Sequence, residues 1–204
     1  FSLPPYNLVF INFLTLPALL YILINHADKK FIFFFIGWIF GFGYFISNLY
    51  WITNSLTFDE NLKFIIPFAL ILIPTFLGLF YGLITYFSSF FDLKNKFSSI
   101  LIFSLFFGVV EFLRSFIFGG FPWNLIVFSL SNNLYSLQIL SYIGTYSLNL
   151  FSITIFLLPI VIFFQYGNFQ KSIILTLGVV LVLMNIGYGN QNLKRFKQIN
   201  NENL

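Results

Sequence analysis

Long apolar runs separated by short polar clusters account for most of this chain. Six runs stand out among the 204 residues, at positions 8–25, 31–52, 64–91, 98–118, 137–165 and 172–188. A helix needs about 20 apolar residues to cross the hydrocarbon layer of a bilayer, and each run is close to that length. The pattern predicts an all-α protein, a polytopic transmembrane bundle of about six spanning helices.

The stretch at 119–135 interrupts this pattern without bringing in any charge. It contains Pro122, Asn124 and the cluster Ser131-Asn132-Asn133, which disfavour a continuous spanning helix. We therefore expect an interfacial or re-entrant loop here. Within the fifth run, Gly144 and Pro159 are expected to bend the helix.

Composition narrows the class of protein further. Hydrophobic residues make up 59% of the chain, charged residues 8%, and the mean hydropathy is +0.92. Soluble domains carry about 25% charged residues, so a soluble domain is excluded. The chain contains no cysteine, which excludes a disulfide, a thiolate metal site and a cysteine nucleophile within these residues.

Other ligands are also disfavoured by the sequence. The single histidine, His26, has no second ligand at metal spacing, so we predict no metal site and no cofactor. The ten basic residues are scattered between apolar runs rather than clustered on one face, so no nucleic-acid partner is expected.

The positions of the basic residues predict an orientation. Lys29, Lys30, Lys94, Lys96 and Lys171 fall on three alternate loops, which places those loops on the cytoplasmic side. Residues 1–188 then form the transmembrane helical domain and 189–204 a polar tail on the periplasmic side. The tail carries three basic residues, against the rule, unless it leads into a large exported domain. We expect it to lead towards a periplasmic domain that this chain does not contain.

Glu111 and Arg114 are the first candidates for a functional role, because they lie inside the fourth apolar run. A charge at the centre of a membrane helix costs about 2.5 to 3.5 kcal/mol on insertion scales. A spacing of three puts both side chains on one helical face, where they can pair. Two interpretations remain open at this point. Either the pair neutralises itself near the membrane surface, with Arg114 reaching the headgroups, or it holds a loop or an anionic substrate.

The segment Gly119-Gly120-Phe121-Pro122-Trp123 is the second candidate. Its glycines free the backbone, its proline fixes it, and its aromatic rings suit a membrane interface. The segment could be an interfacial anchor with a helix break or a functional loop. Small residues four apart, Gly37 with Gly41 and Gly78 with Gly82, are expected to permit close helix contact.

Several stretches together resemble the membrane domain of the apolipoprotein N-acyltransferase family. The strongest are Glu111-Phe112-Leu113-Arg114 and Gly119-Gly120-Phe121-Pro122-Trp123-Asn124, and weaker ones lie at 1–7, 41–45, 49–52 and 138–147, the last with Ser147 in place of a glycine. They occur in the family's order over nearly the whole chain. The six runs resemble the second to seventh of the family's eight transmembrane helices.

The resemblance implies a bacterial inner-membrane, multi-pass acyltransferase. In the family, a periplasmic nitrilase-like domain with a glutamate, lysine and cysteine triad moves an acyl chain from phospholipid to the N-terminal cysteine amine of diacylated lipoproteins. The implied partners are therefore a phospholipid acyl donor, a diacylated lipoprotein acceptor and membrane lipids. No triad residue is expected in this chain, which should be inactive alone.

By the same resemblance, this chain's site residues concern lipid access rather than catalysis. Phe121, Pro122 and Trp123 would line the entrance for lipid, while Glu111 and Arg114 would brace that loop or face a headgroup phosphate. Without the resemblance, two other functions stay open. One is a small transporter or channel-like bundle in which Glu111 and Arg114 line a polar path, and the other is a structural subunit.

Overall fold

The computed structural model describes residues 1–25, 30–94, 96–117 and 120–202, and these are helical or irregular with no strand among them. His26, Lys29 and Gly119 lie outside the described residues. The helical elements in chain order are η1 (Val9–Ile11), α1 (Asn12–Asn25), α2 (Lys30–Leu49), η2 (Tyr50–Phe58), η3 (Glu60–Ile65), α3 (Ile66–Ser88), α4 (Phe97–Arg114), η5 (Ile126–Leu130), α5 (Leu134–Leu137), α6 (Leu140–Leu157), η6 (Leu158–Phe163) and α7 (Asn168–Glu202).

The all-α membrane class is confirmed. Within the described residues, five helical stretches are long and apolar enough to cross a membrane: Lys30–Phe58, Lys63–Ser88, Phe97–Arg114, Leu140–Phe163 and Asn168–Phe196. The apolar helix Val9–Asn25 is shorter. These six stretches correspond to the six apolar runs of the sequence.

The predicted bends lie where the sequence places glycine and proline. Gly144 has φ 76° and ψ 167°, which interrupts the helical backbone inside α6. Pro159 lies in the first turn of η6, where the α-helix gives way to 3₁₀ geometry. Ser147 lies in the helical part of α6, after the break.

Helices α2 and α3 form a closely packed pair because glycines line their contact. A Cβ atom at Gly41 would lie 2.7 Å from Cβ of Tyr81, and one at Gly82 would lie 2.8 Å from the ring of Phe34. No side chain fits into such gaps without displacing the partner helix. The close contact predicted from the two glycine pairs is confirmed.

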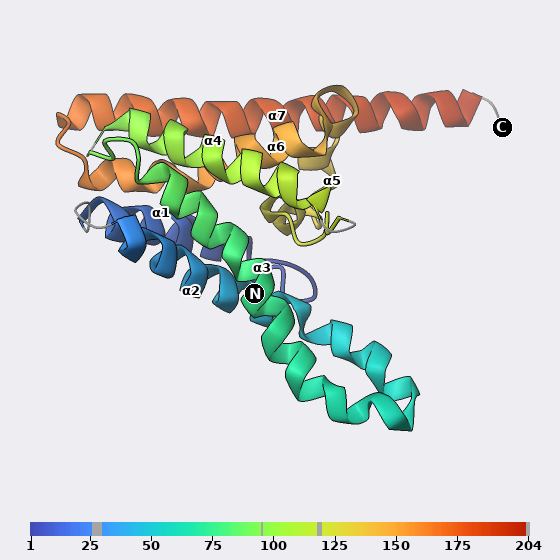
Figure 1. The fold of residues 1–204 in the computed structure, drawn as a ribbon. Coiled ribbons are helices and arrows are strands. Elements are labelled where there is room, and N and C mark those ends of the chain that lie inside the picture. The colour runs from blue at the N-terminus through green and yellow to red at the C-terminus, as the bar shows by residue number, and fades with distance from the viewer. Residues whose placement is uncertain (26–29, 95, 118–119, 203–204) are drawn as a thin grey trace.

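The bundle has two ends, and the lysines near the starts of α2, α4 and α7 lie at the same end. In the fold of Figure 1, α4 packs between α3 and α6, α1 also packs on α6, α2 pairs with α3, and α7 packs on η6 and α5. Helices α2, α4 and α7 begin at the left-hand end, which therefore holds Lys30, Lys96 and Lys171. The segment 120–139 and the end of α7 lie at the opposite end.

Helix α7 continues through the segment expected to form the tail. Its 35 residues give a length of about 52 Å, which exceeds the roughly 30 Å of a hydrocarbon core. The far part packs on α5: the Asn185 side-chain amide donates to the Ser136 carbonyl at 3.1 Å, and Gly189 sits against the Tyr135 carbonyl. The boundary between residues 188 and 189 is thus a change of composition within one helix.

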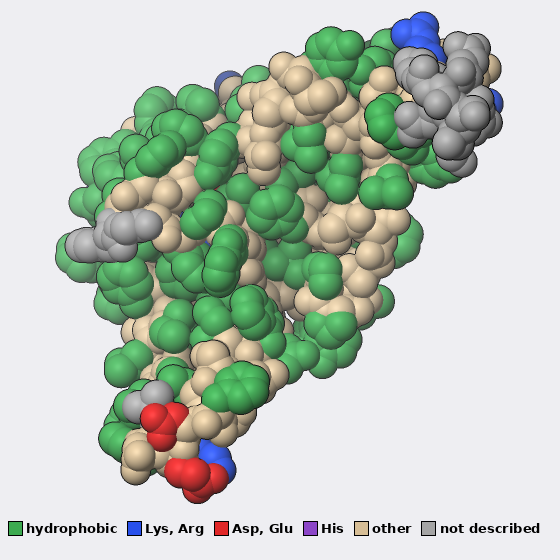
Figure 2. Space-filling view, turned by 90° about the vertical axis from the view of Figure 1, so that its right-hand side faces the viewer, with side chains coloured by type: hydrophobic (Ala, Val, Ile, Leu, Met, Phe, Trp, Pro, Cys, Tyr) green, Lys and Arg blue, Asp and Glu red, His purple; other side chains and the backbone are tan. Residues whose placement is uncertain are grey.

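The surface is apolar over a wide area, as expected for a protein surrounded by lipid. Figure 2 shows hydrophobic side chains over most of this face, with acidic side chains gathered at the tip of the arm formed by η2, η3 and the start of α3. Asp59, Glu60 and Lys63 are the exposed charged residues of that tip.

Candidate functional site

The last turns of α4 bring Glu111 and Arg114 together in the interior. Both side chains are 1% exposed, and Nη2 of Arg114 lies 3.8 Å from Oε1 of Glu111. The predicted pairing on one helical face is therefore present. Burial of the guanidinium does not fit the interpretation in which Arg114 reaches out to lipid headgroups.

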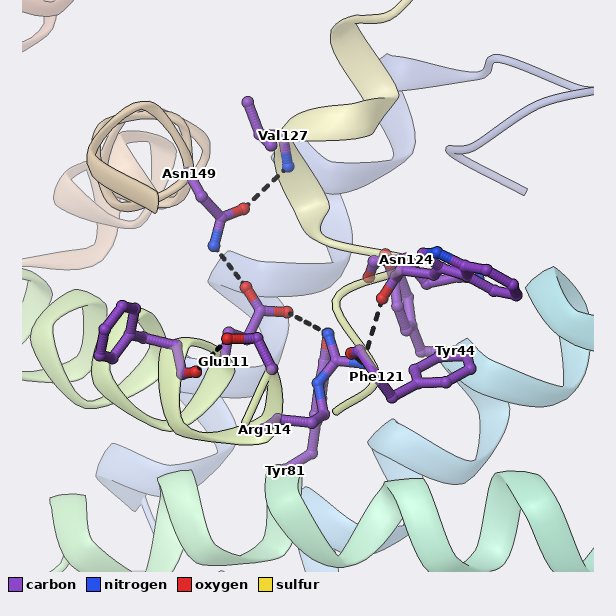
Figure 3. A network of polar contacts seen from close by, with 11 residues as sticks. Tyr44, Tyr81, Glu111, Arg114, Phe121, Asn124, Val127 and Asn149 are labelled. Carbon is purple, nitrogen blue, oxygen red and sulfur yellow. Dashed lines mark hydrogen bonds and ion pairs between the residues drawn. The ribbon is translucent and has the colours of Figure 1, made fainter. Parts of the chain in front are cut away.

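Glu111 also receives hydrogen bonds from two other helices. The Tyr81 hydroxyl on α3 donates to Oε1 at 3.0 Å, and the side-chain amide of Asn149 on α6 donates to Oε2. Asn149 in turn accepts the backbone N–H of Val127 at 2.9 Å (Figure 3). The carboxylate therefore links α3, α4 and α6 to the segment that follows α4.

Arg114 holds the backbone of that segment. Its Nη1 donates to the carbonyls of Phe121 at 3.0 Å and Trp123 at 3.1 Å. The guanidinium also lies 5.3 Å from the ring centre of Phe45 and 5.7 Å from that of Phe121, within cation–π range. These contacts correspond to the loop-holding interpretation of the charged pair.

The backbone of the segment turns sharply at two left-handed residues. Gly120 has φ 83° and Asn124 has φ 57°. Glycine adopts this region freely, and asparagine is the side-chain-bearing residue that tolerates it well. Next to Gly120, the Phe121 N–H donates to the Arg114 carbonyl at 3.1 Å, which ties the start of the loop to the end of α4. The Tyr44 hydroxyl then donates to the Asn124 carbonyl at 3.0 Å, and the Asn124 amide donates to the Asn48 carbonyl at 3.3 Å.

This inward bonding of the backbone leaves the side chain of Trp123 on the surface. The indole is 53% exposed, and its ring centre lies 6.1 Å from that of Trp51 and 5.6 Å from that of Phe121. Pro122 is exposed beside it. We call residues 120–124 the tryptophan loop.

Two mainly apolar cavities border the tryptophan loop. One, of about 380 Å³, includes Trp123 and is lined by Leu3, Pro4, Asn48, Trp51, Trp123, Asn124 and Phe128. The other, of about 430 Å³, includes Phe121 and Arg114 and is lined by Ile52, Leu72, Ile73, Phe76, Leu77, Phe80, Arg114, Ile117, Gly120 and Phe121. Apolar cavities with a few fixed polar groups are the usual form of a binding site for a small apolar ligand.

The structure thus brings together all five residues that the sequence singled out, and adds partners that the sequence analysis missed. Tyr81 and Asn149 donate hydrogen bonds to Glu111, Tyr44 donates one to the Asn124 carbonyl of the loop, and Trp51 lies beside Trp123. A signal existed for Asn149, since an amide inside an apolar membrane run needs a partner. Among the described residues there is no group of three His, Cys, Asp or Glu side chains that could hold a metal ion.

Comparison with known proteins gives a consistent set of relatives. The family model described as the apolipoprotein N-acyltransferase N-terminal domain matches residues 1–158. The apolipoprotein N-acyltransferase of Brucella melitensis is 31% identical over 209 residues, covering 98% of this chain and 38% of the relative. That of Rickettsia bellii is 36% identical over 159 residues, covering 78% of this chain and 31% of the relative. The chain spans less than two fifths of the length of the curated relatives that it matches.

Proposed function

The chain belongs to the apolipoprotein N-acyltransferase family, and from this premise we propose that it forms the membrane part of such an enzyme. The reaction we assign to the whole enzyme is transfer of an acyl chain from phospholipid to the N-terminal cysteine amine of a diacylated lipoprotein. The role of this chain is to anchor the enzyme in the bacterial inner membrane and to admit the lipid and the lipoprotein.

The observation that carries this role is the fixed, exposed position of Trp123 in a loop whose residues line two apolar cavities. Arg114 binds the loop carbonyls, so the loop keeps its shape while the indole faces outward. The cavity of about 380 Å³ beside Trp123 and the one of about 430 Å³ beside Phe121 offer room for parts of acyl chains. A tryptophan at the membrane interface combines an apolar body with an N–H donor, which suits contact with a lipid ester or headgroup.

The chemical step itself needs a group that this chain does not have. By similarity to the family, a cysteine thiolate would attack the phospholipid ester carbonyl, release the lysophospholipid and pass the acyl group to the lipoprotein amine. This chain contains no cysteine. The thiolate, with its glutamate and lysine partners, would come from a periplasmic domain beyond the polar end of α7.

The transporter hypothesis finds less support in the geometry. It needs Glu111 and Arg114 along an open polar path, whereas both are 1% exposed. Their polar atoms face Tyr81, Asn149 and the loop carbonyls, and the cavity beside Arg114 is lined mainly by apolar residues.

A chimera tests the proposed function. This chain replaces the matching region of the Brucella melitensis relative, and purified enzyme in phosphatidylethanolamine vesicles is assayed for N-acylation of a diacylated lipopeptide. We expect activity above that of the empty vesicles. A chimera that inserts and folds yet stays inactive would contradict the proposal.

Substitution of Trp123 in the same chimera tests the lipid-access role. We expect Trp123→Ala to lower kcat/KM by about tenfold or more, through lost positioning of lipid at the entrance. The matched control is Phe10→Ala, because Phe10 is a 77% exposed aromatic outside both cavities. Equal losses in the two variants would remove the reason for placing lipid entry at Trp123.

A further inference from the structure

We propose that Asn149 is a positioning residue for the tryptophan loop, acting through both ends of its side-chain amide. The inference concerns where Trp123 is held, and only its consequence for lipid access rests on the proposed function. Asn149 lies on α6, a helix that does not itself carry a residue of the loop.

Each end of the Asn149 amide has one chemically determined partner. The carboxylate of Glu111 accepts only, so it requires the NH₂ end, and the N–H of Val127 donates only, so it requires the oxygen. The side chain is 0% exposed, so water does not compete for either bond. Aspartate could not donate to Glu111, and leucine of similar volume could make neither bond.

Residues 120–130 are therefore held at two places, and the side chain that holds each place is bound to the carboxylate of Glu111. Its first half is bound through Arg114, which pairs with Glu111. Its second half is bound through Asn149, which also bonds Glu111. Figure 3 shows these contacts converging on Glu111 from opposite sides. Loss of Asn149 should therefore loosen the loop although Asn149 does not touch Trp123.

A reciprocal exchange of the two groups gives a specific test. In Asn149→Asp two carboxylates face each other and the donor is lost. Adding Glu111→Gln restores the pairing with donor and acceptor exchanged, since the new glutamine can donate to the new aspartate. The aspartate can still accept the Val127 N–H, and the site keeps one negative charge near Arg114.

The position of Trp123 can be followed by its own fluorescence. The chain has three tryptophans, so Trp38→Phe with Trp51→Phe leaves Trp123 as the single emitter. In this background, in phosphatidylethanolamine nanodiscs, the Stern–Volmer constant for acrylamide reports how accessible Trp123 is. The control is Ser152→Ala, one turn along α6, where the lost hydroxyl bonds only the Leu148 carbonyl of its own helix.

We expect Asn149→Leu and Asn149→Asp each to change the quenching constant by about twofold or more, and the exchanged pair Asn149→Asp with Glu111→Gln to return it close to the parent value. Ser152→Ala should leave it unchanged. Folded Asn149 variants with the quenching constant of Ser152→Ala would overturn the proposal. If the single variants do not fold, a folded exchanged pair with parental quenching supports it, and failure of the pair to fold overturns it.

The same background separates this inference from the lipid-access role. Phospholipids brominated on the acyl chain quench an indole only when they approach it closely. If the parent Trp123 is not quenched by them, the lipid-access role fails. The acrylamide comparison among the Asn149 variants still decides the positioning role.

Discussion

At the scale of single residues, the burial of Arg114 is the most demanding feature of the site. A buried charge costs several kcal/mol unless it is paired and hydrogen-bonded. Here Glu111 supplies the opposite charge, two loop carbonyls accept from Nη1, and the rings of Phe45 and Phe121 flank the guanidinium. The tryptophan loop is therefore part of what stabilises the charge, and the charge is part of what shapes the loop.

Gly120 makes the tight turn of the loop possible, which leads to a prediction for Gly120→Ala. The residue has φ 83°, and a Cβ atom would overlap the Ser115 carbonyl oxygen. A left-handed residue with a side chain costs about 1 to 3 kcal/mol, and the overlap adds to it. We expect a lower melting temperature in detergent and a shifted Trp123 emission.

The control for this prediction is Gly167→Ala, because Gly167 also lies between helices but has open space where its Cβ would go. The free energy of unfolding of Gly167→Ala should lie within about 1 kcal/mol of that of the parent, so its melting temperature should be close to the parent's. Equal melting temperatures for Gly120→Ala and Gly167→Ala, with unchanged emission, would show that the turn at Gly120 is not strained by a side chain.

The sequence predicts those parts of the site that depend on interactions within one helix, and not those that depend on how helices pack together. The cost of a charge in an apolar run is local, so Glu111, Arg114 and their pairing at a spacing of three can be read directly. Tyr81 and Asn149 lie 30 and 38 positions from Glu111. Their contacts depend on how α3, α4 and α6 pack, which the spacing of residues along one helix does not determine.

At the scale of elements, the α2–α3 pair leads to a prediction for Gly37→Ala. A Cβ at Gly37 would lie 2.5 Å from the backbone oxygen of Tyr81 and would collide with Thr85, whose hydroxyl donates to the Phe33 carbonyl at 2.6 Å. Backbone atoms cannot move aside cheaply, so we expect a loss of about 1 to 3 kcal/mol on thermal unfolding.

Gly43→Ala is the matched control, on the same helix but with nothing within 4 Å of the new Cβ. Alanine favours a helix over glycine by about 1 kcal/mol, so this variant should be as stable as the parent or slightly more stable. A Gly37→Ala protein as stable as Gly43→Ala would mean that α2 and α3 do not pack as closely as described.

The apolar runs predict the existence of the elements better than their ends. The second run ends as 3₁₀ helix η2 rather than as a continuation of α2, and α7 continues well beyond the sixth run. Where α7 enters the polar sequence, Gly189 packs closely against the Tyr135 carbonyl of α5, and the Asn192 amide donates to the Gln138 side chain at 3.0 Å. Such a tertiary contact overrides composition, so hydropathy alone does not place that boundary.

At the scale of the whole molecule, the two ends of the bundle differ in chemistry. Lys30, Lys96 and Lys171 share one end, while the tryptophan loop and its two cavities lie at the other. If the lysine-bearing end is cytoplasmic, as the charge rule predicts, the tryptophan loop is at the periplasmic face. That is the side on which the family's catalytic domain is expected, so the orientation and the proposed function depend on each other.

The orientation is open to direct measurement because the chain contains no cysteine. Single variants Asn61→Cys, in the arm, and Asn168→Cys, at the start of α7, place exposed thiols at opposite ends. We expect a membrane-impermeant maleimide to label Asn61→Cys in intact spheroplasts. Asn168→Cys should react only after permeabilisation, and its labelling then shows that the thiol is accessible. The reverse pattern would place the tryptophan loop in the cytoplasm, away from exported lipoproteins, and would contradict both the orientation and the acyltransferase role of this face.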